Sequence, residues 1–446
     1  MPKKRIVLRQ TLTQGRLNLL FHPISLSVFL LVLAGCGFQQ PGTSATSLHV
    51  SACQTNMQQQ VGQPIGLYSI HMFSETAGWG LSIGTVKDQN GTVSLTGETC
   101  ILHTTDGGSH WKVVKTWKLS TATILTPFFP FFFSETTAWV AVENHLSSTN
   151  DAGTTWLTSD LLLASGESAL IRNLTFVDGN AGWLMTEINP SSTPPKSAPT
   201  SALFHTSDGG HHWKQLLRVS GNSSSTPQIN AGSKIYFLTA TTGWMTGLSI
   251  LPGTASQREW LFMTGDGGRT WQPQTLPLPI GVKSLSGLSL GQPRFYSSRD
   301  GILPASINQS SDGTPNGFLG FVTHDGGLSW QSQPFVAEDY NEVYQKTLKP
   351  GEVNDLVYRL TPTPQFTDMQ FGWVGDPYLE MFITSDGGQH WQRLELRSLP
   401  KGVEQIQFIS SSVGWGMIQS DDGRSSRLYR TTDGGKTWTQ VIPTIV

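Results

Sequence analysis

Charged residues are scarce in this chain of 446 residues, and cysteine is scarcer still. Only 13% of the residues are charged, three are cysteines, and no His or Cys cluster has the spacing of a zinc site. The sequence also lacks a Walker loop, a Gly-x-Ser-x-Gly elbow and an HExxH motif. It therefore predicts no cofactor, no metal and no catalytic residue.

Charge is unevenly distributed along the chain. Met1 to Cys36 contains five Lys or Arg and no acid, so the rest of the chain holds 24 basic and 31 acidic residues, a net charge of −7. A chain of this charge repels polyanions on average, and the sequence predicts no nucleic-acid partner.

The first 35 residues have the pattern of an export signal, with a basic stretch up to Arg16 and an apolar run from Ile24 to Leu33. This run is shorter than the roughly 20 residues that span a bilayer. Leu33-Ala34-Gly35-Cys36 resembles the lipobox of bacterial lipoproteins, in which cleavage precedes the cysteine and its sulfur carries a diacylglyceryl group. The resemblance implies a protein attached by lipid at Cys36 to the outer side of the cytoplasmic membrane, at the cell surface or in the periplasm. The alternative is a plain signal peptide or an uncleaved anchor.

Residues 36–64 are rich in Gln, Ser, Thr and Gly without a sustained period, which predicts a flexible tether. Cys53 lies in this tether and Cys100 lies just before the first repeat's turn. Two alternatives stay open for this pair, a disulfide or two free thiols, because the sequence does not supply the Cα separation that a disulfide requires.

Seven copies of one motif, Thr-x-Asp-Gly/Ala-Gly-x-x-Trp, occupy residues 65–446, and we call each copy a box. They recur every 45 to 61 residues, a period typical of propeller blades. The aspartates are Asp106, Asp151, Asp208, Asp266, Asp325, Asp386 and Asp433, and the tryptophans are Trp111, Trp156, Trp213, Trp271, Trp330, Trp391 and Trp438.

The residue types of the box indicate a structural role in a tight turn between two strands. The aspartate and a flanking hydroxyl can accept from backbone N–H groups, and Gly permits a positive φ. The Trp then begins the next strand and places its ring between sheets. His110, His212 and His390 precede three of these tryptophans where Thr or Ser stands in the other boxes, which predicts a shared hydrogen bond in the turn.

A second pattern, an aromatic residue followed after six or seven positions by Gly-Trp or Ala-Trp, precedes six boxes. The pairs are Phe73 and Trp79, Phe133 and Trp139, Phe176 and Trp183, Phe237 and Trp244, Phe366 and Trp373, and Phe408 and Trp415, with Tyr296 and Gly301-Ile302 in the fifth repeat. Each repeat then predicts four short strands. The predicted fold is all-β, a seven-bladed propeller with four-stranded antiparallel blades and a box between the third and fourth strands. The last blade takes all four strands from its own repeat, and Gln60 to Gly66 could add a strand at the ring closure.

The box matches the Asp-box, or BNR repeat, of sialidases, sortilin-type receptors and the photosystem II assembly and stability factor family. Its alternation with Gly-Trp most resembles the last of these, a family of non-enzymatic seven-bladed propellers that bind a partner protein during assembly of a membrane complex. The resemblance implies a binding or scaffold protein that is not an enzyme, and no photosynthetic role is inferred from it. Together with the lipobox, the sequence predicts a lipid-anchored scaffold propeller, which we expect to be a monomer. The alternative is an extracellular sialidase-like hydrolase or glycan-binding lectin.

The long connections of the predicted propeller all fall on one face, where a protein or glycan partner is expected to bind. The longest, Pro334 to Thr363, contains Tyr340 and Tyr344 and is interpreted either as a contact arm or as a solvated charged loop. Three arginines lie close to the predicted innermost strands, and their guanidinium groups suit carboxylates. The candidate binding residues are therefore Arg172, Arg294, Arg359, Tyr340 and Tyr344.

Overall fold

The computed structural model of the protein describes residues 61–87, 93–118, 128–142, 144–164, 167–189, 200–220, 233–250, 257–308, 316–337, 363–376, 380–394, 398–400, 403–420 and 425–446. The chain divides into two compact units, Met1–Phe38 and Gln39–Val446, and every described residue belongs to the second. Cys36, Cys53, Tyr340, Tyr344 and Arg359 lie outside the described residues, as do the predicted signal and most of the tether.

The described residues form strands and no helix, and the strands group into seven sheets, numbered here as blades 1 to 7. Blade 1 contains β1 (Ser69–Met72), β2 (Gly78–Lys87), β3 (Val93–Thr104) and β4 (His110–Lys118). Blade 2 contains β5 (Phe128–Phe132), β6 (Ala138–Val142), β7 (His145–Thr149) and β8 (Leu157–Asp160). Blade 3 contains β9 (Ser168–Phe176), β10 (Gly182–Asn189), β11 (Thr200–Thr206) and β12 (Lys214–Ser220).

Blade 4 contains β13 (Ile235–Phe237), β14 (Gly243–Ile250), β15 (Gln257–Thr264) and β16 (Gln272–Gln274). Blade 5 contains β17 (Leu288–Leu290), β18 (Arg294–Phe295), β19 (Gly301–Ile307), β20 (Gly317–Thr323), β21 (Gln331–Ser332) and β22 (Val336–Ala337). Blade 6 contains β23 (Gln365–Phe366), β24 (Gly372–Asp376), β25 (Glu380–Thr384) and β26 (Gln392–Leu394). Blade 7 contains β27 (Gln405–Phe408), β28 (Gly414–Gln419), β29 (Ser426–Thr431) and β30 (Thr439–Val441), and β31 (Thr444–Ile445) follows.

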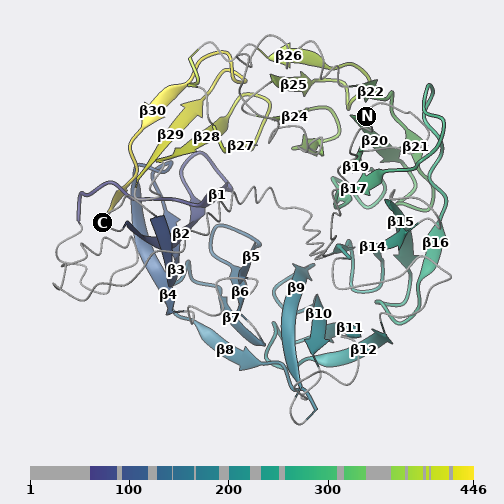
Figure 1. Cartoon of the computed structure of the whole chain (residues 1–446), viewed down its shortest axis with the longest axis horizontal. Coiled ribbons are helices and arrows are strands. Elements are labelled where there is room, and N and C mark those ends of the chain that lie inside the picture. Colours follow the sequence, from purple (N-terminus) through teal and green to yellow (C-terminus); the bar gives the residue numbers. More distant parts are fainter. Residues whose placement is uncertain are drawn as a thin grey trace, which may run out of the picture. The chain divides into compact units, whose positions relative to one another are not determined.

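The seven blades form a ring, which confirms the predicted seven-bladed all-β propeller (Figure 1). The first strand of a blade lies toward the centre and the fourth toward the periphery, as β5 and β8 show in Figure 1. Blade 5 departs in detail because its first and fourth strands are each divided in two around a proline, Pro293 and Pro334. Proline has no N–H to donate to the ladder, so pairing is interrupted there.

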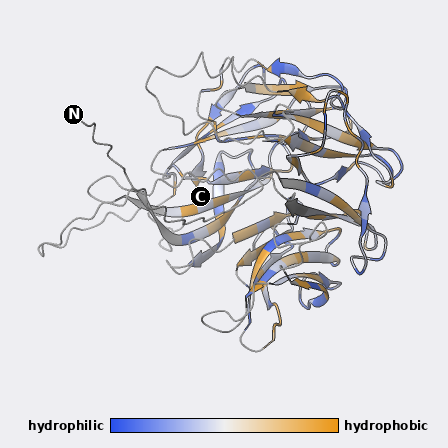
Figure 2. Ribbon diagram, turned by 45° about the vertical axis from the view of Figure 1, so that its right-hand side comes forward, coloured by the Kyte–Doolittle hydropathy of each residue, from blue (hydrophilic) through white to orange (hydrophobic). Residues whose placement is uncertain are grey.

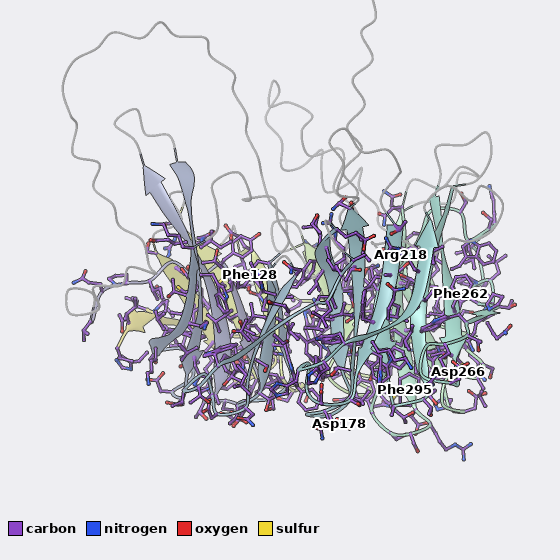
Figure 3. The ribbon with its side chains drawn as sticks, turned by 90° about the horizontal axis from the view of Figure 1, so that it is seen from below. Phe128, Asp178, Arg218, Phe262, Asp266 and Phe295 are labelled. Atoms are coloured by element: carbon purple, nitrogen blue, oxygen red, sulfur yellow. The ribbon has the colours of Figure 1, made fainter. Side chains whose placement is uncertain are left out.

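The connections of a blade fall at two ends of the ring because neighbouring strands run antiparallel. Turns between the first and second strands share one end with the boxes, and we call this end the box face; the other connections define the long-loop face. In Figure 3, Asp178 and Asp266 lie at the box face and Arg218, near the end of β12, lies toward the opposite end.

The turn between the first two strands is five residues long in every blade. The residue that pairs with the Gly or Ala of the second strand is Met72, Phe132, Phe176, Phe237, Phe295, Phe366 or Phe408. The predicted aromatic positions Phe73, Phe133 and Tyr296 were thus one residue too late. A Cβ on Gly182 would lie 2.4 Å from the Phe176 ring, which explains why Gly usually precedes the Trp.

The hydrophobic core is distributed over the boundaries between blades. Seven buried clusters each combine residues of two neighbouring blades, one cluster for each boundary of the ring. Hydrophobic residues are visible as orange segments along the strands in Figure 2. The part of the chain that the structure describes has no helix long and apolar enough to span a membrane.

The ring is closed by the end of the chain, which the sequence did not reveal. Blade 7 does supply its own four strands, but β31 pairs in parallel with β4 on the outer edge of blade 1. Part of the segment predicted to add a strand contacts this closing strand, because Val61 and Pro64 form isolated bridges to Ile445 and Thr444.

Two glutamines also join blade 7 to blade 1 at the innermost strands. Gln407 Oε1 accepts from the Met72 N–H at 2.8 Å, and its Nε2 donates to the Met72 carbonyl at 2.9 Å. Gln405 makes the same pair of bonds with Ile70 at 2.9 and 2.7 Å. The side chains therefore satisfy backbone groups that the free inner edge of β1 would otherwise leave unpaired.

Candidate functional site

Each box uses both oxygens of its aspartate within its own turn. In blade 7 the Thr431 hydroxyl donates to Asp433 Oδ1 at 2.8 Å and accepts from the Gly435 N–H at 2.9 Å. Asp433 Oδ1 also accepts from the Thr437 N–H at 2.9 Å, and Oδ2 accepts from the Thr437 hydroxyl at 2.6 Å. These contacts leave the carboxylate engaged in the turn.

The position before the box Trp supplies the predicted shared hydrogen bond. His110, His212 and His390 place Nδ1 at 2.5 to 2.6 Å from Oδ2 of the box aspartate. In the other four boxes the Thr or Ser hydroxyl donates to the same oxygen at 2.5 to 2.6 Å. Imidazole and hydroxyl are thus interchangeable here.

These hydrogen bonds lower the pKa of the box aspartates. The Thr437 hydroxyl and N–H hold the pKa of Asp433 at about 2, and the Ser329 hydroxyl and N–H do the same for Asp325. No group of three side chains suited to a metal ion occurs among the described residues.

Tryptophan serves packing between blades in the described ring. Trp139 and Trp183 stack on Phe176 and Phe237 of the next blade with centroids 3.7 and 3.6 Å apart. Their indole N–H groups donate to backbone carbonyls in the boxes of those same blades, at 2.8 and 3.0 Å. Trp117, which belongs to neither sequence pattern, makes an edge contact with the ring of Trp156 in blade 2.

The two described candidate arginines have different partners. Arg172 on β9 donates to Glu187 Oε2 of the same blade, through Nη2 at 2.6 Å and Nε at 3.2 Å. Arg294 on β18 is exposed and donates through Nη1 to the Phe366 carbonyl of blade 6 at 3.1 Å. Arg294 directly precedes Phe295 as Gln407 precedes Phe408, so both residues link an innermost strand to the next blade.

Arg294 also influences the ionisation of His71 on β1. Burial, together with the nearby Arg294 guanidinium, lowers the pKa of His71 to about 4. His71 is therefore neutral at pH 7, and of these two residues only Arg294 is positively charged.

A buried ion pair at the long-loop face escaped the sequence analysis. Lys234 Nζ lies 3.3 Å from Glu259 Oε2 and donates to the Leu290 carbonyl, while Glu259 accepts from the Leu290 N–H at 2.5 Å. The pair thereby joins blade 4 to the first strand of blade 5. No sequence signal pointed to it, because Lys234 and Glu259 lie 25 residues apart and Leu290 lies a further 31 residues along the chain.

Tyr68 and Glu404, on the first and last blades, form a second group that the sequence did not indicate. Burial and the Glu404 carboxylate raise the pKa of Tyr68 to about 12, and burial raises the pKa of Glu404. Both residues immediately precede an innermost strand and lie where the ring closes.

Cys100 on β3 is fully buried and disulfide-bonded. Its partner lies outside the described residues, so the pairing with Cys53 stays a prediction.

The fold defines the chain as a seven-bladed β-propeller. No protein-family model matches it, and no curated protein matches it. Among solved structures it is similar to YCF48 from Cyanidioschyzon merolae, with 17% identity, a TM-score of 0.43, and coverage of 85% of this chain and 99% of the other. It is also similar to YCF48 bound to a D1 peptide, with 18% identity, a TM-score of 0.41, and coverage of 72% and 83%.

A xyloglucanase of glycoside hydrolase family 74 from Xanthomonas campestris is similar as well. It has 13% identity and a TM-score of 0.29, with coverage of 81% of this chain and 62% of the enzyme. At these identities the similarity concerns the fold, and it assigns neither an activity nor a partner to this chain.

Proposed function

We propose that this protein is a lipid-anchored, extracytoplasmic propeller that binds a partner protein through its long-loop face and is not an enzyme. The observation that supports the proposal most directly is the difference between the two ends of the ring. On the box face, every turn between first and second strands has five residues and every box is closed by internal hydrogen bonds. On the long-loop face, 27 residues separate β22 from β23 and 14 separate β12 from β13.

Such an arrangement suits binding because a rigid frame can present connections that vary freely in length and sequence. The described part of the long-loop face carries two ion pairs in blade 3, Arg172 with Glu187 and Arg218 with Glu167. In each pair the arginine Nη2 lies 2.6 Å from a carboxylate oxygen of the glutamate. These pairs offer charged groups of both signs beside the long connections. A partner protein with mixed charge complements such a surface better than a polyanion does.

The proposal is tested by recovering partners from detergent-solubilised membranes with the full-length protein. We expect a partner that is retained by the wild type and lost when residues 338–362 are replaced by a Gly/Ser linker of equal length. The same replacement of residues 221–232 tests the second long connection of this face. Recovery of the same proteins by an unrelated propeller, or retention that is indifferent to both loops, would contradict the proposal.

Glycan hydrolysis is the competing function and makes a different prediction. A sialidase-like site needs arginines that converge with acids on one substrate. Here Arg172 of blade 3 is bonded to Glu187 of its own blade, and Arg294 of blade 5 is bonded to the Phe366 carbonyl of blade 6. We therefore expect no turnover of a panel of fluorogenic glycosides. Turnover that disappears in Arg172→Ala, with the fold intact by circular dichroism, would favour the hydrolase.

A further inference from the structure

The box of blade 5 differs from the other six at the position after its second glycine. Leu328 occupies this position and is 69% exposed. The corresponding residues of the other boxes are Ser109, Thr154, His211, Arg269, Gln389 and Lys436. Only blade 5 therefore presents an apolar side chain at the tip of this turn.

The hydrogen bonds of this box are also rearranged. In five blades the indole N–H of the box Trp donates to the carbonyl of the second box glycine, at 2.8 to 3.1 Å. In blade 5 Trp330 donates instead to Gln274 Oε1, on the outermost strand of blade 4, at 3.0 Å. Gln274 Nε2 in turn donates to the Gly327 carbonyl at 2.8 Å and to Met263 Sδ at 3.3 Å.

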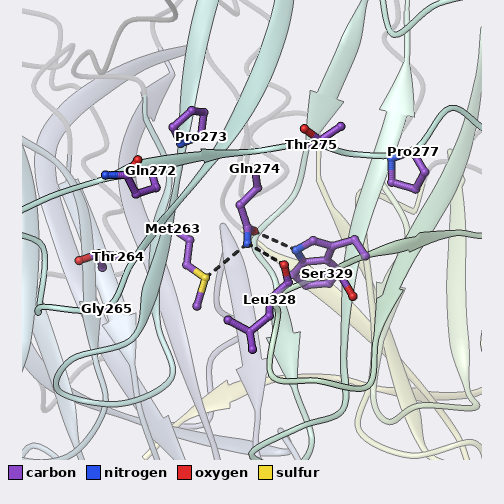
Figure 4. A pocket seen from close by; sticks show the side chains of 11 residues that line it. Met263, Thr264, Gly265, Gln272, Pro273, Gln274, Thr275, Pro277, Leu328 and Ser329 are labelled. Carbon is purple, nitrogen blue, oxygen red and sulfur yellow. Dashed lines mark hydrogen bonds between the residues drawn. The ribbon is translucent and has the colours of Figure 1, made fainter.

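These contacts form one side of an open groove between β16 and the box of blade 5 (Figure 4). Its volume is about 590 Å³, and Met263, Pro273, Pro277, Leu328 and Trp330 supply its apolar lining. Because Gln274 fixes both Trp330 and Met263, the wall is formed before a ligand arrives, which lowers the entropy cost of binding. The volume suffices for one apolar side chain, and the open side of the groove leaves the rest of such a ligand outside it.

The chemistry of the lining selects an uncharged ligand. None of the eleven residues around the groove is charged, although the chain after Cys36 has a net charge of −7. Gln272 and Thr275 are exposed at the groove and offer amide and hydroxyl groups, which can pair with the N–H and C=O groups of a peptide backbone. A layer of lipid acyl chains would leave these polar groups unpaired.

A peptide would bind through its side chains and not by adding a strand to blade 4. Pro273 is the central residue of β16, and it has no N–H to extend the ladder. The apolar surface continues beyond the groove, because Leu278 is 50% exposed and follows Pro277 directly.

We infer that this groove binds an extended, uncharged peptide segment of a partner protein by taking up one of its apolar side chains. The inference extends the proposed binding function to a second surface and does not depend on the long connections.

The test selects a display library of random short peptides on the full-length protein in detergent, in parallel with two variants. Leu328→Ser removes the apolar tip and introduces the residue found at this position in blade 1. Leu162→Ser is the matched control, because Leu162 is 83% exposed in the connection that follows β8 of blade 2 and is not among the residues that line the groove. Both variants are expected to unfold at the wild-type temperature.

We expect enriched peptides that lack charge and share an apolar residue. Their affinity should fall about tenfold or more in Leu328→Ser, the equivalent of losing one buried leucine contact, and stay unchanged in Leu162→Ser. Thr275→Asp, which places a charge at the rim, should reduce binding similarly. Deletion of residues 338–362 should leave peptide binding intact.

Three outcomes would overturn the inference: enrichment that is equal on Leu328→Ser, enrichment of charged peptides, or no enrichment. Dimerisation in sedimentation experiments, or flotation with phosphatidylcholine vesicles, would also overturn it if either were abolished by Leu328→Ser, because the groove would then serve a second copy or a lipid surface. If the groove selects no peptide while the full-length protein still recovers a partner through residues 338–362, the inference about the groove is wrong and the proposed function is unaffected.

Discussion

At the scale of the residue, one position of the box accepts two different side chains for the same purpose. His390 and Thr437 both close their turn by contacting Oδ2 of the box aspartate at 2.6 Å. The geometry of the turn therefore depends on a donor at this place and not on imidazole itself.

We predict that His390→Thr leaves the free energy of unfolding unchanged, whereas His390→Ala lowers it by roughly 0.5 kcal/mol, because a hydrogen bond at an exposed site contributes little. Urea denaturation of both variants measures the difference. Equal stability of the alanine and threonine variants would show that the Oδ2 contact contributes nothing.

The box aspartates also predict how stability depends on pH. The pKa of Asp433 and Asp325 is about 2 in the folded protein and 3.8 in the absence of the turn. A lowered pKa means that the ionised form stabilises the fold; the contribution is complete above about pH 4 and is lost as the pH falls toward 2.

We expect the melting temperature to decrease over this pH range, as followed by circular dichroism. Asp433→Asn should be less stable at pH 7 and should lose less stability on acidification than the wild type. An acid transition of unchanged size in this variant would contradict the assignment.

At the scale of the element, the ring depends on contacts between its first and last blades. Gln407 pairs with both backbone groups of Met72, and Gln365 holds the same position in blade 6. Because backbone groups left without partners are costly, Gln407→Ala should lower the free energy of unfolding by about 1–3 kcal/mol. Gln365→Ala is the control, because among the described residues the Gln365 side chain has no pair of backbone hydrogen bonds like that of Gln407. This variant should lower the free energy of unfolding by less. Chemical denaturation measures the free energy of unfolding of both variants, and an equal loss in the two would contradict the role of Gln407.

The buried pair of Lys234 and Glu259 joins two further elements. Lys234→Met would leave the Glu259 carboxylate buried without its cation, and we expect a loss of about 3–5 kcal/mol in the free energy of unfolding. The double variant Lys234→Met, Glu259→Leu should recover part of this loss, because it removes the unpaired charge. A double variant less stable than the single one would indicate that the hydrogen bonds to Leu290 matter more than the ion pair.

At the scale of the whole molecule, the proposed location depends on Cys36, which lies outside the described residues. We predict that Cys36→Ser shifts the protein from the membrane fraction to the soluble fraction, because the acyl chains that bind the bilayer can no longer be attached. Immunoblotting of fractionated cells measures the distribution. Retention of the variant in membranes would favour an uncleaved anchor.

Much of the architecture could be predicted from the sequence because the interactions that form a box lie within eight consecutive residues. Seven copies in one register therefore predicted the number of blades, the strand order and the position of the turns. The aromatic positions of blades 2 and 5 were misplaced by one residue because neighbouring aromatics, such as Phe295 and Tyr296, are equivalent by composition. In blade 1 the position is occupied by Met72, which an aromatic pattern does not select. Only the pairing of Phe295 with Gly301 distinguishes them.

The sequence by itself determined the repeated turns, the tryptophans between blades and the contrast between uniform and long connections, since each of these is encoded locally. The tertiary structure alone decided how β31 closes the ring, which partners Arg172 and Arg294 contact, and how Gln274 rearranges the box of blade 5. These features join residues that are distant in the sequence. They arise only when the ring brings neighbouring blades into contact.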